Sequence, residues 1–149
     1  MDVTPFKIAQ RFIGLKEGPG ALNEPLVLAM LRLDSKWVEK DETAWCSAFA
    51  NFVCFLLELP RSRSLAARSW LTVGSSVPLS DARPGYDVVV LKRGAGNQPG
   101  PDVLAAPGHV GFYAGQDDAN VLLLAGNQGD AVSIAPFPKA RILGIRRLA

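Results

Sequence analysis

The sequence predicts an α+β domain in which N-terminal helices pack on a C-terminal antiparallel β-sheet. Apolar residues recur at helical spacing through the first half of the chain, whereas short β-branched runs separated by turn residues follow from residue 77 onward. Helices followed by a run of strands favour segregated layers over alternating βαβ units. At 149 residues the chain is long enough for one core, so residues 1–149 are expected to form a single domain.

Three helices are predicted before the strands begin. The pair Thr4-Pro5 is typical of a helix start, and the apolar stripe that follows ends at Gly14 and "EGPG". The segment "NEPLVLAMLRL" restarts a helix with Pro25 in its first turn. The third helix, roughly Ala44 to Leu57, is apolar nearly all round, which predicts a central and buried position. A shorter helical piece is expected in "SLAARSWL".

Five short runs rich in β-branched residues predict the sheet. They cover residues 87–93, 109–115, 121–127, 132–137 and 142–147. The segment 94–108 between the first two runs, "GAGNQPGPDVLAAPG", has a composition that excludes it from the core. A long irregular loop within a compact domain is usually functional or disordered, and a specificity lid is one hypothesis for it.

Composition excludes several classes of function. A net charge of +2 with scattered Lys and Arg does not indicate a nucleic-acid-binding protein. No apolar run has the length of a membrane span, and the N-terminal residues lack the order of a signal peptide, so we expect cytoplasmic synthesis without one. Two cysteines and one histidine fall short of a structural zinc site. No metal or cofactor is therefore expected, and the chain is predicted to be a monomer.

Cys46 is the candidate nucleophile. In "DETAWCSAFANFVC" it lies in the first turn of the third predicted helix, where free backbone N–H groups and the helix dipole lower the pKa of a thiol. A structural role is the alternative, because free cysteine is among the most buried residue types. Cys54 lies two turns deeper among apolar residues and is predicted to be a core filler.

His109 is the only histidine in the chain and therefore the only candidate base for a Cys–His mechanism. It begins a strand directly after the loop 94–108. The strands 109–115 and 121–127 are expected to pair about a turn near 117–118, which makes Asn127 the approximate cross-strand neighbour of His109. An amide side chain at that position would orient the imidazole. Gln128 is the fallback for that role, and ordinary turn composition explains "GNQG" as well. We expect the sulfur and the imidazole to meet across a solvent-open crevice.

Four residues are candidates for binding substrate. Trp45 either lines the groove or anchors the helix in the core. Asp41 and Glu42 either bind a cationic group of the substrate or interact favourably with the dipole of the third helix. Gln128 completes this set if Asn127 orients the imidazole.

The motifs "WCSAF", "GHVGFY" and "GNQ", in that order, resemble the papain-like cysteine peptidoglycan hydrolases of the NlpC/CHAP superfamily, in particular a small branch found in phage and bacterial genomes. The segments "GLKEGPGALNEP", "ARSWL" and "ILGIRR" extend this resemblance over most of the chain. Two departures concern the backbone rather than the catalytic side chains. Tyr86 is interposed in "PGYDVVV", and Ala125-Gly126 stands where the family often has two glycines.

The resemblance implies a papain-like fold, with Cys46 at the N-terminus of a buried helix against a sheet that carries His109 and Asn127. It also implies bacterial peptidoglycan as the substrate, cleaved at an amide bond of the stem peptide or at the N-acetylmuramoyl–L-alanine link. A phage endolysin released by a holin and an antibacterial effector delivered by a secretion system, with an immunity protein as partner, both fit. The alternatives are a catalytically inactive wall-binding or phage structural domain and another thiol acyl-transfer enzyme.

Overall fold

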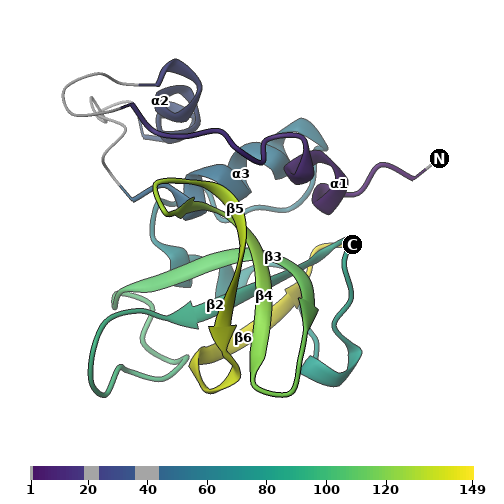
Figure 1. Cartoon of the computed structure of the whole chain (residues 1–149), viewed down its shortest axis with the longest axis vertical. Helices are drawn as coiled ribbons and strands as arrows, with labels where there is room; N and C mark the ends of the chain where they lie inside the picture. Colours follow the sequence, from purple (N-terminus) through teal and green to yellow (C-terminus); the bar gives the residue numbers. More distant parts are fainter. Residues whose placement is uncertain (1, 19–23, 36–43) are drawn as a thin grey trace.

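The computed structural model describes residues 2–18, 24–35 and 44–149 and has the predicted α+β class. Three helices lie together on one side of a curved β-sheet (Figure 1). They are α1 (Pro5–Gln10), α2 (Pro25–Arg32) and α3 (Cys46–Leu56). The 3-10 helix η1 (Ala67–Thr72) lies between α3 and the first strand, and η2 (Leu79–Asp81) lies between the first and second strands.

The sheet is antiparallel, with the strand order β1-β6-β2-β3-β4-β5. Its strands are β1 (Ser75–Ser76), β2 (Asp87–Lys92), β3 (Gly108–Gln116), β4 (Asn120–Gln128), β5 (Ala131–Pro138) and β6 (Ile142–Arg147), with η3 (Lys139–Arg141) before the last. The five predicted strands are confirmed to within one residue at each end. Because β6 returns beside β2, both β2 and β3 are central strands with a neighbour on either side.

Two apolar clusters cover the two faces of the sheet. Val88 and Val90 belong to the cluster beneath the helices, whereas Val89 and Leu91 belong to the cluster on the opposite face. This alternation follows from the two-residue repeat of a strand, and burial on both faces explains the continuous apolar run of β2. The sheet therefore separates a helix-packed core from a second core enclosed by its own curvature.

Helix α1 is shorter than its apolar stripe predicts. Thr4 caps it by accepting a hydrogen bond from the backbone of Lys7, but the helix ends at Gln10. The chain beyond then pairs with β5: the Gly14 N–H donates to the carbonyl of Val132, and the Val132 N–H donates to the carbonyl of Leu15. Pairing with the sheet thus replaces the last helical turn.

Helix α3 occupies the predicted central position, although the prediction that it is buried all round is wrong at its end. Phe49 and Val53 are fully buried, but Phe55 and Leu56 are 50% and 47% exposed. Cys54 lies in the core as predicted, and burial raises the pKa of its thiol to about 12. None of the described helices has the length and apolar character required to cross a bilayer.

Candidate active site

Cys46 is the first residue of α3, as the sequence predicts. The residue before it, Trp45, makes no side-chain capping hydrogen bond to the helix. The first N–H groups of a helix have no partner within the helix and carry a partial positive charge. Cys46 therefore lies at a position that favours a negatively charged sulfur.

A buried polar network fixes the start of α3. The Ser47 hydroxyl donates to the carbonyl of Ser64 at 2.5 Å and accepts from the Trp70 indole at 2.9 Å and the Asn51 amide at 3.4 Å. The side-chain amide oxygen of Asn51, Oδ1, in turn accepts a hydrogen bond from the backbone N–H of Arg63 at 2.9 Å. Because Ser47 and Asn51 are one helical turn apart, this network sets the rotation of α3 and hence the direction of the Cys46 side chain.

Trp45 anchors the helix in the core, and its role as a groove-lining substrate contact is wrong. The side chain is completely buried. A Cβ atom placed on Gly126 would lie 2.6 Å from two carbon atoms of the indole ring. The close approach of β4 to Trp45 therefore requires glycine at position 126, the second residue of the Ala125-Gly126 pair.

Cys46 and His109 lie close together, and the interaction between their side chains shifts the pKa of each. Burial on its own raises the pKa of the Cys46 thiol. The hydrogen bond and positive charge of His109, the N–H of Val110 and the charge of Arg93 oppose burial and leave the pKa below its ordinary value.

The pKa of His109 shifts in the complementary direction. Burial lowers it, and the charge of Arg93 acts in the same sense. The hydrogen bond and charge of Cys46, together with the hydrogen bond to Gln128, outweigh both and leave the pKa of His109 raised. A lowered thiol pKa beside a raised imidazole pKa favours a thiolate–imidazolium pair.

Gln128 contacts the imidazole on the side away from Cys46. Its side-chain amide oxygen, Oε1, lies 2.9 Å from His109 Nε2. The orientation of this amide follows from its other contacts. Its NH₂ group donates to the carbonyls of Leu123 and Ser133 at 3.2 and 2.7 Å, and to the Ser133 hydroxyl at 3.2 Å. Two carbonyl oxygens accept only from the nitrogen end, so the amide oxygen faces the ring and Nε2 must carry a proton. Nδ1 is then the nitrogen that faces Cys46.

Gln128, the fallback, and not Asn127 contacts the imidazole, and the position of a β-bulge explains this correction. The role of Gln128 as a substrate contact stays a prediction, since it also lines the pocket beside His109. The pairing of β4 with β5 shifts register between Ala125 and Gln128, and Asn127 has a left-handed backbone with φ 61°. A shift of one residue exchanges the two faces of a strand. Gln128 consequently takes the position beside His109 that regular alternation gives to Asn127.

A pocket of about 430 Å³ opens beside His109. It is lined by Leu91, Lys92, Arg93, His109, Asn127, Gln128, Gly129, Ser133, Ala135, Pro136, Phe137 and Arg141. His109 is only 7% exposed and Cys46 only 3%. The expected solvent-open crevice thus reaches the imidazole, while the sulfur is almost covered.

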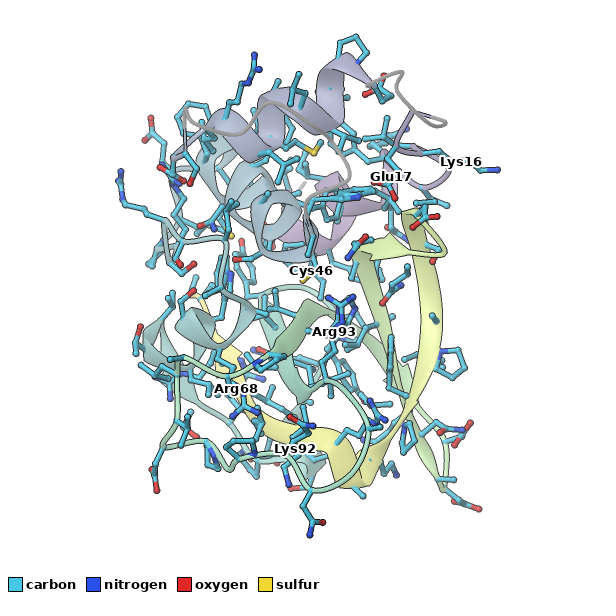
Figure 2. All side chains as sticks on the ribbon, turned by 90° about the vertical axis from the view of Figure 1, so that its left-hand side faces the viewer. Lys16, Glu17, Cys46, Arg68, Lys92 and Arg93 are labelled. Atoms are coloured by element: carbon cyan, nitrogen blue, oxygen red, sulfur yellow. The ribbon has the colours of Figure 1, made fainter. Side chains whose placement is uncertain are left out.

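Arg93 separates this pocket from a second one of about 440 Å³, because its side chain lines both. The second pocket is mostly apolar, with a wall from Leu65 to Ala67 and another from the loop 94–108. Arg93 lies next to Cys46, whereas Lys92 is farther from the sulfur (Figure 2). The two pockets therefore share Arg93, and the first of them also reaches His109. The sequence analysis missed Arg93, whose only signal is its position at the end of a strand.

The loop 94–108 wraps around Arg68, a second residue that the sequence analysis missed. This side chain is fully buried and donates to four loop carbonyls. The acceptors are Pro99, Gly100, Val103 and Pro107, at 2.8 to 3.0 Å. An arginine within the otherwise apolar "SLAARSWL" was the available signal. The contacts anchor the loop as a wall of the second pocket, and its role as a lid stays a prediction.

Some predicted residues are outside this description. Asp41 and Glu42 lie outside the described residues, and their roles stay predictions. Within the described ranges, no group of three or more His, Cys, Asp or Glu side chains is placed to hold a metal ion.

Comparison with known proteins bears on the fold. No protein-family model matches the chain, and no curated protein matches it. Among solved structures, it is similar to NlpC1 from Trichomonas vaginalis, with a TM-score of 0.59 and 18% sequence identity over 97% of this chain. The similarity covers 42% of that protein, so this chain spans less than half its length. The α+β fold of this chain is NlpC-like.

Proposed function

We propose that this chain is a thiol amidase or peptidase that cleaves an amide bond of bacterial peptidoglycan. The observation that carries the proposal is the pairing of Cys46, at the N-terminus of α3, with His109, which lines a pocket. Gln128 completes the site by holding His109 in the tautomer that accepts a proton on the side of the sulfur. The NlpC-like fold supports a papain-like peptidase, and the sequence motifs support peptidoglycan as its substrate.

The mechanism uses the side chains of Cys46 and His109 and the backbone N–H groups at the start of α3. The Cys46 thiolate attacks the amide carbonyl and forms a carbon–sulfur bond, while the N–H groups at the start of α3 stabilise the oxyanion. His109 then gives its proton to the departing nitrogen as the carbon–nitrogen bond breaks. Water attacks the resulting thioester, giving one proton to His109 and releasing the carboxylic acid and the Cys46 thiolate.

The biological setting follows from the same proposal. An endolysin released from the cytoplasm and an effector delivered by a secretion system both bring a single catalytic domain to the cell wall, and an effector requires an immunity protein in the producing cell. We propose a monomer in either case.

Lysis of purified sacculi, followed by turbidity, tests the proposal. Cys46→Ala and His109→Ala are expected to lose at least about a thousandfold in rate, because they remove the nucleophile and its base. Cys54→Ala is the matched control, since it removes the other thiol of α3 and leaves the reacting atoms in place. Full lysis by either active-site variant would overturn the mechanism. Lysis lost equally in the control would instead indicate damage to the fold.

A further inference from the structure

We infer that the pocket beside His109 binds a carboxylate of the substrate, on the side of the departing amine. The anion-binding property stands on the described residues alone, whereas the side assignment rests on the proposed function.

The lining is cationic. Lys92, Arg93 and Arg141 all contribute to it, and its described residues include no aspartate or glutamate. Within the described ranges, the ion pairs join Arg61 to Asp34 and Arg147 to Asp87 and involve none of the three. Three cations around one hollow repel one another, and this arrangement favours an anionic ligand.

The surface beneath these charges is apolar. Phe137 lies against the imidazole of His109, with ring centroids 5.2 Å apart. Leu91, Ala135 and Pro136 continue the apolar surface. Low-dielectric walls strengthen the interaction between a bound anion and the surrounding cations. A guanidinium binds a carboxylate through two parallel hydrogen bonds, so Arg93 and Arg141 suit a carboxylate at the end of a short apolar chain.

The pocket lies on the base side of the reacting pair. Its described lining includes His109 but not Cys46. The acyl group becomes attached to the sulfur, whereas the departing nitrogen must lie within hydrogen-bonding reach of the imidazole that protonates it. A group held in this pocket therefore belongs to the amine half of the substrate. Arg93 lies between the two halves, because it lines this pocket and also acts on Cys46 (Figure 2).

The single histidine provides a direct assay. We would record the imidazole Hε1 resonance in the Cys46→Ala protein, which undergoes no chemistry, during titration with glutarate and with its neutral diamide, glutaramide. Glutarate is expected to shift this resonance in a saturable way, and glutaramide is expected to shift it at least about tenfold less effectively. Glutarate affinity should fall at least about threefold in Arg93→Gln, Lys92→Gln and Arg141→Gln. Added salt should weaken glutarate binding by the unsubstituted pocket and reduce its advantage over these variants.

Arg11→Gln is the control, because Arg11 is exposed at the end of α1 and has no part in the pocket. Equal effects of glutarate and glutaramide, or affinities unchanged in all three pocket variants, would overturn the inference. Sacculus lysis that fails while glutarate still binds would refute the proposed function and leave the anion site intact.

Labelling of new amino groups in a sacculus digest tests the side assignment. The fragments that gain an amino group are expected to carry a free carboxylate on the newly terminal residue, and Arg141→Gln is expected to raise KM for their release more than it lowers kcat. Newly terminal residues without a carboxylate would place the anion on the other half of the substrate and overturn the assignment.

Discussion

At the scale of single residues, the chemistry of the site depends on which nitrogen of His109 carries the proton in the neutral ring. The answer comes from Gln128, whose amide is oriented by the carbonyls of Leu123 and Ser133. The amide oxygen accepts from Nε2, so Nδ1 faces Cys46 as the proton acceptor. A neutral glutamine is sufficient to select the tautomer of His109, because the backbone carbonyls of Leu123 and Ser133 fix the orientation of its amide.

We predict that Gln128→Ala lowers the rate of lysis at least about tenfold and that Asn127→Ala changes it less than about threefold, since only Gln128 contacts the imidazole. The pH dependence of Cys46 alkylation by iodoacetamide separates orientation from folding. The thiolate reacts, so the rate rises with pH through the pKa of Cys46, with a midpoint below the ordinary value of about 8.5.

Gln128→Ala and His109→Ala are expected to move this midpoint upward, because each weakens the imidazolium that stabilises the thiolate. Cys54 provides an internal reference: its pKa of about 12 keeps it unreactive in the folded protein. A midpoint that is the same in wild type, Gln128→Ala and Asn127→Ala would contradict the orienting role.

At the scale of elements, the site is assembled where helix α3 meets strand β4. The helix brings Cys46, and the strand brings Gln128. Their separation is set by Trp45, which packs directly on the backbone of Gly126 two residues before Gln128. The contact that holds the helix to the sheet therefore also sets the position of the glutamine.

Gly126→Ala is predicted to destabilise the fold by about 1–3 kcal/mol, because the added methyl group would overlap the rigid indole of Trp45. Urea denaturation measures this change. Gly100→Ala is the matched control, since an added Cβ there meets no atom within 4 Å and its free energy of unfolding is expected to change by less than about 0.5 kcal/mol. Equal stability of the two variants would show that β4 can move away from α3 without cost.

At the scale of the whole molecule, a few long-range contacts hold irregular segments against the regular layers. Arg68 is the clearest case, since it joins η1 to the loop 94–108 through carbonyls that are 31 to 39 residues away along the chain. Arg147 is another, because its guanidinium pairs with the buried carboxylate of Asp87 in β2 and also donates to the carbonyl of Asp81 in η2. These contacts hold the wall of the second pocket and the end of the sheet in place without regular secondary structure.

Arg68→Met is predicted to lower the free energy of unfolding by more than about 2 kcal/mol, because it leaves four loop carbonyls without their donor. Limited proteolysis should then cut within 94–108 at least about tenfold faster than in wild type. Arg11→Met is the control for loss of an exposed arginine. Unchanged proteolysis of the loop would show that Arg68 does not anchor it.

The sequence by itself determined the α+β class, the five strands, and the places of Cys46 and His109, because hydrophobic periodicity and helix-start signals are local properties of the chain. It assigned the orienting role to Asn127, with Gln128 as the fallback, and the structure reverses that order. The tertiary structure decided that choice, the burial of Trp45, and the roles of Arg68 and Arg93. The physical reason is that a β-bulge, a backbone contact and a buried guanidinium depend on partners distant in the chain, which no local pattern records.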